Sequence, residues 1–250
     1  MDFNSIIAEM AAKYKDNRLI RGLFLYPHRY YQEFRLKRFR NREKKAFRKS
    51  ALEALKALDE CLTSNNIEYS LATGTLLGAV REKGFIPHDI DIDIFVWAED
   101  YSTALIELLA SNGFDRQYSF FVDDGKLGRE DSFRYKGVQI DIFYVYSPRN
   151  EQPYFTDYNA FEDAPSRELS VRKHGGLQPR RISMPIVKEF HRVPFETLSL
   201  PIAINAEEVL KSRYGADFMT PRPQWSPAEF NPNVSFMEGK LGKFKDFRKA

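Results

Sequence analysis

Residues 72–97, ATGTLLGAVREKGFIPHDIDIDIFVW, decide the fold of this chain. A Gly-Thr pair at residues 74–75 begins a segment whose apolar residues are spaced as in a short helix, and an Asp/Ile alternation follows it. Side chains two residues apart lie on the same face of a strand, so Asp89, Asp91 and Asp93 are predicted to share one face. The isoleucines between them are then free to face the core.

Three carboxylates this close repel one another unless a cation lies between them. Oxygen ligands suit a hard divalent cation such as Mg²⁺, with Mn²⁺ as an alternative. The competing interpretation is the solvated face of an amphipathic edge strand. That interpretation explains the alternation, but it explains neither the preceding Gly-Thr pair nor the absence of an interleaved lysine. We therefore interpret the strand as part of a metal site.

Length and composition indicate a globular protein. The chain has 250 residues, of which 43% are hydrophobic and 29% charged, which is enough for one large domain or a domain with an appendage. The one cysteine, Cys61, lies on a helical apolar stripe and is expected in the core, and it excludes an internal disulfide. No stretch approaches the ~20 apolar residues of a membrane span, and we expect a cytoplasmic protein.

Positive charge is concentrated near the N-terminus. Residues 18–49 contain twelve Lys or Arg and two acids, so the remaining residues carry a net charge of −7 within an overall charge of +3. Aromatic and leucine residues alternate with the basic ones, and Pro27 is expected to divide the segment. Such a segment can lie on an anionic membrane, grip nucleic acid, or pack on the domain with its charges solvated.

Hydrophobic periodicity predicts further elements along the chain. A helix is expected at 44–65, another after Asp100 as its cap, and a third at 205–214 with an Asn205-x-x-Glu208 capping box. Strands are expected at 67–71, 118–122, 132–135 and 138–146. Residues 147–193 give no clear element, and their Arg and His residues are equally compatible with phosphate contact or an exposed loop.

Asp141 is unusual because it stands between isoleucines in an apolar strand. A carboxylate in that position needs a compensating partner. It can hydrogen-bond a neighbouring loop, or it can complete a metal site with Asp91 and Asp93. We favour the metal site, because three carboxylates can hold two Mg²⁺ ions about 3.5–4 Å apart for an in-line displacement at phosphorus. Backbone amides at the Gly-Thr helix start would bind phosphate.

Three blocks together resemble the LicD/fukutin family of phosphotransferases. They are the segment from Gly74 to Ile94, the IDIF run at 140–143, and LKSRYGADFMTP at 210–221. The chain departs from the family pattern at Glu82, His88 and Ile90, where His, Trp and Asp are usual, but the principal acidic pair is intact.

The resemblance implies an α+β fold, a nucleotidyltransferase-like mixed β-sheet flanked by helices. It also implies transfer of a phospho-alcohol, either phosphocholine or an alditol phosphate, from a CDP-activated donor to a sugar hydroxyl, with release of CMP. With the basic segment, the expected organisation is a helical arm at 1–45, a catalytic domain at 46–235 and a basic tail at 236–250. Because acceptors of such enzymes are commonly lipid-linked, the arm is expected to hold the enzyme at the inner face of the membrane.

The resemblance also assigns roles to residues. Asp91, Asp93 and Asp141 would be the catalytic and metal-binding carboxylates, and Asp141 is the candidate general base. Arg81 would stabilise developing charge; its competing interpretation is a solvated helix-end residue beside Glu82. The residues expected to contact the donor nucleotide are Gly74, Thr75, Arg81, Lys83 and Asp89.

Two other functions remain open from the sequence. One is a nucleotidyltransferase that modifies a small molecule and releases pyrophosphate instead of CMP. The other is a non-catalytic nucleic-acid binder that uses the basic arm; it leaves the four aspartates unexplained and predicts salt-sensitive oligonucleotide binding that survives Asp91→Ala.

Overall fold

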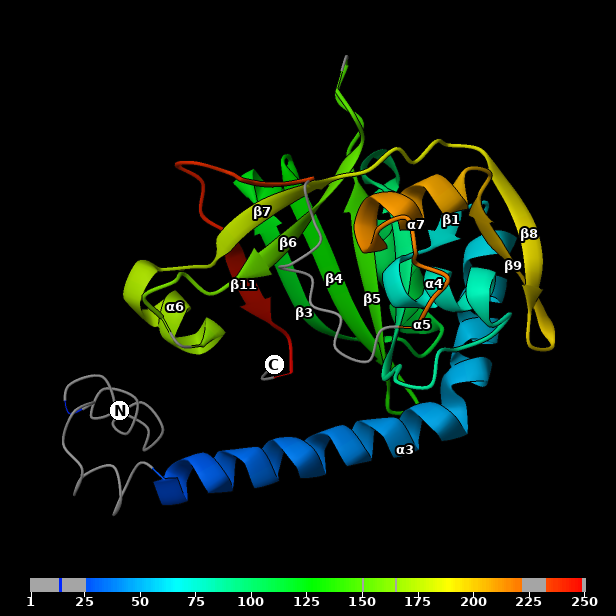
Figure 1. Ribbon diagram of the computed structural model, residues 1–250. Helices are drawn as coiled ribbons and strands as arrows, with labels where there is room; N and C mark the ends of the chain where they lie inside the picture. Colours follow the sequence, from blue (N-terminus) through cyan, green and yellow to red (C-terminus); the bar gives the residue numbers. More distant parts are fainter. Residues whose placement is uncertain (1–13, 15–25, 150, 165, 222–232, 249–250) are drawn as a thin grey trace.

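The computed structural model describes residue 14 and residues 26–149, 151–164, 166–221 and 233–248 (Figure 1). The first part of the helical arm expected at 1–45, including residues 18–25 of the basic segment, therefore lies outside the described residues, apart from Tyr14. In the first part of the long helix α3, the structure describes the backbone and only some side chains.

A six-stranded mixed sheet forms the centre of the molecule, in the order β1-β2-β5-β4-β3-β11. The strands are β1 (Tyr69–Leu71), β2 (Asp91–Trp97), β3 (Asp115–Val122), β4 (Gly128–Tyr135), β5 (Val138–Val145) and β11 (Lys243–Asp246). β2 and β5 are parallel and every other neighbouring pair is antiparallel. With its helices, this mixed sheet confirms the expected α+β class.

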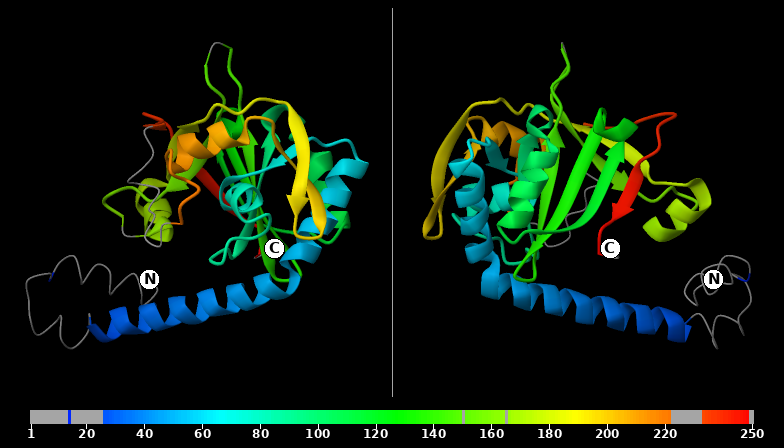
Figure 2. Two further views of the ribbon diagram at one scale, coloured as in Figure 1. Left: turned by 45° about the vertical axis from the view of Figure 1, so that its right-hand side comes forward. Right: turned by 180° about the vertical axis from the view of Figure 1, so that it is seen from behind.

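The isoleucines of β2 and β5 form the rear face of the sheet, as the alternation predicted. Ile92, Ile94, Ile140 and Ile142 are all 0% exposed. Figure 2 shows α5 (Thr103–Ser111) and the C-terminal half of α3 (Tyr26–Ser64) on that side. Burying one such side chain contributes about 1.5–3 kcal/mol, so this face fixes which way the intervening aspartates point.

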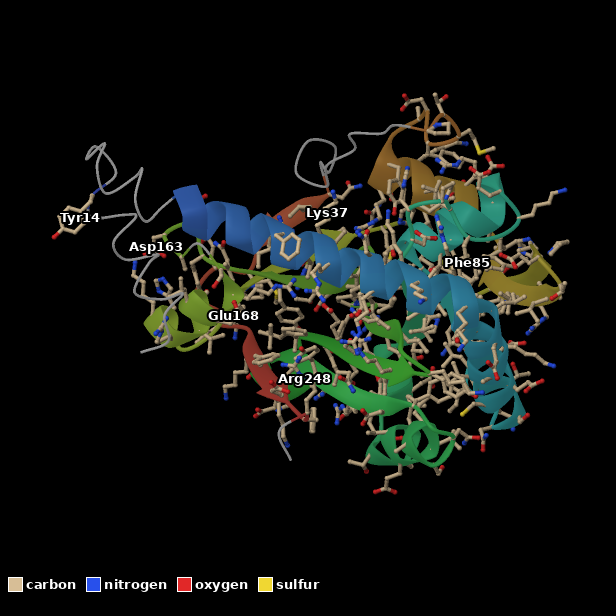
Figure 3. The ribbon with its side chains drawn as sticks, turned by 90° about the horizontal axis from the view of Figure 1, so that it is seen from below. Tyr14, Lys37, Phe85, Asp163, Glu168 and Arg248 are labelled. Carbon is tan, nitrogen blue, oxygen red and sulfur yellow. The ribbon has the colours of Figure 1, made fainter. Side chains whose placement is uncertain are left out.

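α3 begins at Tyr26, and Pro27 lies in its first turn. A proline is tolerated there because the first N–H groups of a helix have no intrahelical partner. The helix runs without interruption from Tyr26 to Ser64, so Pro27 does not break it. It also continues past residue 45, where the arm was expected to end. Phe47 of α3 packs edge-on against Phe85 at 4.8 Å between ring centroids, and Phe85 packs likewise against Phe195. Figure 3 shows α3 from below, with Lys37 on its N-terminal half and Phe85 where it meets the domain.

The cap of α5 differs from the expectation. Ser102 is the N-cap, and its side chain accepts a hydrogen bond from the backbone N–H of Leu105. Asp100 instead ends the short 3₁₀ turn Ala98–Asp100. The C-terminal end follows the prediction, because Asn112 caps the helix and Gly113 adopts a positive φ of 86°.

Residues 147–193 contain more regular structure than the sequence predicts. They form β6 (Tyr154–Asn159), α6 (Arg167–His174), β7 (Gln178–Ser183) and β8 (Phe190–Phe195). β6 and β7 join β10 (Val234–Phe236) in a three-stranded sheet, and β8 pairs with β9 (Leu198–Ala203). The basic residues here have local partners: Arg180 pairs with Asp157, and Arg181 pairs with Glu151.

α7 (Ala206–Tyr214) occurs as expected, but its capping box does not form. The Asn205 side chain caps no N–H of the helix. Its amide donates to the carbonyl of Pro185 at 2.5 Å and to the Glu208 carboxylate at 3.1 Å. Asn205 thus ties the helix start to the preceding segment. Among the described residues, no helix is long and apolar enough to span a bilayer.

Candidate active site

The parallel pairing of β2 with β5 creates the carboxylate cluster. Asp93 is directly opposite Asp141 in the register, and Asp91 is opposite Gln139. Because side chains alternate across a strand, Asp91, Asp93 and Asp141 all project from the face opposite the buried isoleucines. Each offers a carboxylate oxygen within 4.8 Å of the others. The sequence-predicted metal set is therefore brought together by two strands that are separated along the chain.

The first turn of α4 (Thr73–Arg81) is fixed to the same cluster. The Thr73 hydroxyl donates to the Asp93 carboxylate, and the Thr75 hydroxyl accepts from the Asp93 backbone N–H at 3.0 Å. A Cβ atom at Gly74 would lie 3.3 Å from an Asp89 carboxylate oxygen and 3.9 Å from one of Asp93. Glycine thus lets the helix N-terminus, a preferred place for phosphate, lie directly beside the acids.

The environment of the cluster disfavours negative charge. Burial, and next the Asp141 charge, raise the pKa of Asp91 to about 6. Burial, and then the neighbouring Asp91 and Asp141 charges, raise the pKa of Asp93 well above its usual range. Burial also raises the pKa of Asp141. Without a cation, the folded protein therefore holds these groups at an electrostatic cost.

The donor set fits a hard divalent cation. One Asp141 oxygen accepts a hydrogen bond from the Gln139 side chain at 2.8 Å. The other, Oδ1, is buried and has no hydrogen-bond partner within the described part of the chain. A buried carboxylate oxygen without a partner is costly, and a cation held with Asp91 and Asp93 would satisfy it. Oxygen-only ligands are those that Mg²⁺ and Mn²⁺ prefer.

Asp89 does not belong to the strand, which corrects the expectation of three aspartates on one strand face. β2 begins at Asp91, and Asp89 lies in the preceding loop, where its carboxylate accepts from the Ile86 backbone N–H at 3.1 Å. It still lies beside Gly74 at the edge of the cluster. Burial raises the pKa of Asp89 to about 7.

Arg81 and Lys83 differ in their relation to the site. Arg81, at the end of α4, pairs with Glu82 at 2.9 Å, and its guanidinium also lies 3.4 Å from the Phe218 carbonyl oxygen. This is the contact that the competing interpretation of Arg81 anticipated, although the side chain is only 12% exposed. Lys83 is exposed, and its backbone, rather than its side chain, contacts the body of the domain through Glu196.

Arg213 is a cation near the cluster to which the sequence analysis gave no role. Its charge is the one that most lowers the pKa of Asp93, against the larger effects that raise it. Its Nε and Nη1 atoms are buried without a hydrogen-bond partner in the described residues. Arg213 lies in the last turn of α7 and belongs to the family-like block at 210–221. Its place in that block was the sequence feature that could have indicated it.

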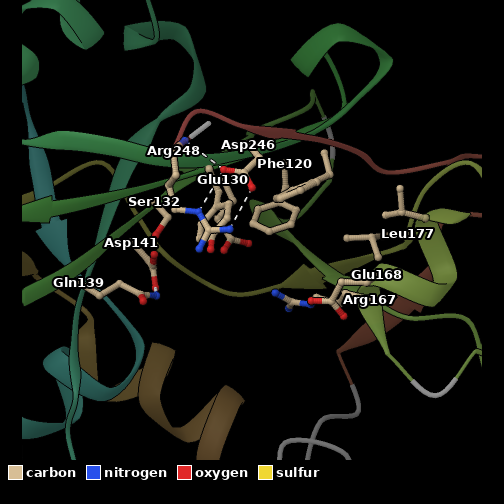
Figure 4. Close-up of a pocket in the computed structure, with 13 residues that line it drawn as sticks. Phe120, Glu130, Ser132, Gln139, Asp141, Arg167, Glu168, Leu177, Asp246 and Arg248 are labelled. Carbon is tan, nitrogen blue, oxygen red and sulfur yellow. Dashed lines mark hydrogen bonds and ion pairs between the residues drawn. The ribbon is translucent and has the colours of Figure 1, made fainter. Parts of the chain in front are cut away.

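A cavity of about 590 Å³ opens beside Asp141 (Figure 4). Its floor is the face of β5, β4, β3 and β11 that lies opposite the buried isoleucines, and α6 forms a wall. Glu130 and Ser132 of β4 and Arg167 of α6 line it, none of which the sequence analysis had selected. Arg167 was not indicated because no helix was predicted at α6, and Glu130 and Ser132 were not indicated because the pairing of β4 with β5, which brings them beside Asp141, was not predicted.

Three carboxylates beside a helix N-terminus and an open cavity could hold a divalent cation next to a phosphate group. The family model described as LicD/FKTN/FKRP, nucleotidyltransferase domain, matches residues 66–202. The chain belongs to this family.

Relatives show how far the similarity extends. A Rickettsia prowazekii protein described as uncharacterized is 28% identical over 219 residues, which cover 80% of this chain and 77% of that protein. The ribitol-5-phosphate transferase fukutin of Macaca fascicularis is 28% identical over 195 residues, covering 77% of this chain but 38% of fukutin. The lipopolysaccharide cholinephosphotransferase LicD of Haemophilus influenzae is 57% identical over 35 residues, covering 14% of this chain and 13% of LicD. The chain thus spans well under half the length of these two named transferases.

Proposed function

We propose that this protein is a LicD-type phosphotransferase with a nucleotidyltransferase-type fold. It moves a phospho-alcohol from a CDP-activated donor to a sugar hydroxyl of a cell-surface or lipid-linked glycan, with Mg²⁺ as cofactor. The observation that carries the proposal is the convergence of Asp91, Asp93 and Asp141 within 4.8 Å beside the first turn of α4. By their names, fukutin and LicD transfer ribitol phosphate and phosphocholine, and in both the moved group is a phosphorylated alcohol.

In the proposed reaction, the acceptor oxygen attacks the phosphorus that carries the alcohol. A new O–P bond forms, the bond from that phosphorus to the bridging diphosphate oxygen breaks, and CMP leaves with the electron pair. Asp141 takes the proton of the acceptor hydroxyl, and the backbone at Gly74 and Thr75 contacts the donor phosphates. Asp89, Arg81 and Lys83 complete the proposed nucleotide contacts. Bound Mg²⁺ would neutralise the charge that the carboxylates and phosphates bring together.

A thermal-shift screen tests the proposal. CDP-choline, CDP-ribitol, CDP-glycerol and nucleoside triphosphates are each added with and without Mg²⁺. A donor at one hundred times its Kd should stabilise the fold by about 2.7 kcal/mol. We expect stabilisation by a CDP-alcohol with Mg²⁺, and its loss in Asp141→Asn. Stabilisation by nucleoside triphosphates alone, with pyrophosphate as the product, would instead identify a nucleotidyltransferase.

We further propose that the basic segment at residues 18–49 holds the enzyme at the inner, anionic face of the cell membrane. Within its described part, Lys44, Lys45, Arg48 and Lys49 lie together on one surface of α3. Each basic residue near an anionic membrane contributes about 1 kcal/mol. The catalytic domain is tied to this helix by an ion pair at 3.1 Å between Glu43 and Arg134.

Co-sedimentation with anionic vesicles at moderate salt tests this second proposal. The full chain should pellet with anionic but not with neutral vesicles, and Lys45→Gln with Arg48→Gln should weaken binding. Lys126→Gln with Lys240→Gln removes the same charge elsewhere and should leave it unchanged. A full chain that stays in the supernatant contradicts the proposal, and salt-sensitive oligonucleotide binding would favour a nucleic-acid partner.

A further inference from the structure

The cavity beside Asp141 is a built continuation of the carboxylate cluster. Strand pairing sets Asp141 opposite Ser132, Ser132 opposite Tyr118, and Tyr118 opposite Asp246. These residues therefore form one continuous row across β5, β4, β3 and β11. Because neighbouring strands lie about 4.8 Å apart, the row extends roughly 14 Å from the cluster. A ligand lying on it would begin at the proposed reaction centre.

A second row supplies an aromatic surface and a carboxylate. Glu130 is opposite Phe120, and Phe120 is opposite Phe244, with 5.1 Å between the two ring centroids. Glu130 lines the cavity, and no hydrogen bond or ion pair engages its carboxylate among the described residues. Burial, and then the Asp141 charge, raise the pKa of Glu130 well above its usual range. Glu130 lies two residues before Ser132, which is opposite Asp141, so a side chain that can accept a hydrogen bond and has no protein donor among the described residues lies close to Asp141.

The charges of the lining argue against a phosphate ligand. Four acids and two arginines contribute to it, and one of the arginines is already engaged. Arg248 donates to the Asp246 carboxylate from Nε at 3.1 Å and from Nη2 at 2.9 Å, and it lies over the Tyr118 ring. Carboxylates that accept hydrogen bonds from hydroxyls, next to aromatic faces, instead suit a neutral ligand rich in hydroxyl groups.

The position of the cavity fits the attacking side of the reaction. α4, with Gly74 and Thr75, lies on the β1–β2 side of the cluster, whereas the cavity lies beyond β5 on the other side. An in-line displacement needs the attacking and leaving oxygens on opposite sides of phosphorus. If the donor phosphates occupy the α4 side, the cavity is where an attacking hydroxyl would enter, next to Asp141.

We propose that this cavity binds the acceptor sugar, with Glu130 accepting a hydrogen bond from a sugar hydroxyl and the exposed Phe244 ring forming the surface under the sugar ring. The proposal rests on the proposed function. It adds that the donor binds on the α4 side of the carboxylates and the acceptor in the cavity beyond β5. It makes Glu130 and the β11 residues determinants of acceptor binding and not of donor binding.

The test compares wild type, Glu130→Gln and the control Glu162→Gln, which removes an exposed acid just before α6. Binding of a set of simple methyl glycosides is followed by ligand-observed NMR at millimolar concentrations. CDP binding with Mg²⁺ is measured by calorimetry, and CMP release from CDP-ribitol and CDP-choline is measured with water alone and with each glycoside. We expect Glu130→Gln to weaken glycoside binding about two- to tenfold, as for one lost hydrogen bond between neutral groups. CDP affinity should stay within twofold of wild type.

The outcomes separate the two levels of the proposal. If Glu130→Gln weakens CDP binding while glycoside binding persists, the cavity holds the nucleotide, and the acceptor assignment is wrong. If no glycoside binds the wild type, the sugar assignment is overturned. If wild type binds glycosides but releases no CMP from any CDP-alcohol, the proposed function fails while the sugar site stands. Phe244→Leu, at the partly exposed edge of the floor, repeats the test without changing a charge.

Discussion

Replacing Asp91 with asparagine should stabilise the metal-free protein and remove its response to Mg²⁺. The carboxylate of Asp91 is half-buried, and its nearest acidic neighbours are the other two members of the cluster. Asparagine keeps the shape of the side chain and removes its charge. In the absence of a cation it should therefore relieve repulsion, whereas in the presence of Mg²⁺ it removes a ligand.

The magnitude follows from the pKa of Asp91, which burial, and then Asp141, raise from 3.8 to about 6. Each unit is 1.36 kcal/mol, so ionised Asp91 costs the metal-free fold up to about 3 kcal/mol above pH 6. Because the folded-state pKa is the higher one, the wild type loses this stability as the pH rises from about 4 to 6. The variant should lack that loss, and in a chain of this size its Tm at pH 8 should be about 6–12 °C higher at most.

The assay is thermal and urea unfolding at pH 4 and pH 8, in chelator and in Mg²⁺ with CDP. Asp124→Asn is the matched control, because Asp124 is exposed on a turn with φ 53°, a conformation that asparagine also tolerates. A variant that is less stable than wild type in chelator at pH 8 would refute the charge argument. A variant that is stabilised by Mg²⁺ and CDP as much as wild type would refute the metal assignment.

Three further predictions follow from contacts around the cluster. Arg213→Met should weaken CDP binding in calorimetry at least tenfold, since it removes the cation whose charge most lowers the pKa of Asp93. Arg81→Met should weaken it less, because Arg81 is paired with Glu82, and equal losses would contradict this ranking. Gly74→Ala should leave the free energy of unfolding within about 1 kcal/mol of wild type, because alanine favours helix. It should raise the Kd for CDP, because the added Cβ lies beside the carboxylates at the helix start, and an unchanged Kd would show that phosphate binds elsewhere. Ser102→Ala should cost about 0.5–2 kcal/mol in urea unfolding without affecting CDP binding, and a neutral result would mean that its cap bond contributes nothing.

The orientation of the acidic side chains could be predicted because alternation is a strong local signal. The isoleucines of β2 and β5 indicate which face of each strand is buried, so Asp91, Asp93 and Asp141 were expected on the opposite faces. The family resemblance marked the same three residues. Alternation does not fix the partner of a strand or its register, because a shift by two residues keeps the same face buried, and only the structure places Asp93 opposite Asp141.

The cavity could not be predicted because its walls come from segments with weak periodicity. α6 is a short polar helix in which only Ser170 is buried, and β11 alternates lysine with Phe244 and Asp246. Tertiary pairing with β3, rather than local propensity, makes the latter segment a strand. Asp89 was wrongly placed on the strand because the Asp/Ile alternation begins at Asp89, two residues before β2 begins at Asp91.

The two arginines near the cluster differ in how they could be found. The family resemblance suggested Arg81 as the residue that stabilises developing charge, and in the structure it pairs with Glu82 while its charge, against the larger effect of burial, lowers the pKa of Asp89. Arg213, more than 100 residues away from the acids along the chain, is the arginine whose charge bears most on Asp93. Only the packing of α7 onto the site reveals that relation.

The most direct measurement is anomalous X-ray scattering from crystals grown with Mn²⁺ and CDP. We expect a manganese peak within bonding distance of carboxylate oxygens from Asp91, Asp93 and Asp141, with the diphosphate at the first turn of α4. Manganese bound elsewhere, or a diphosphate bound away from these three carboxylates, would contradict this expectation.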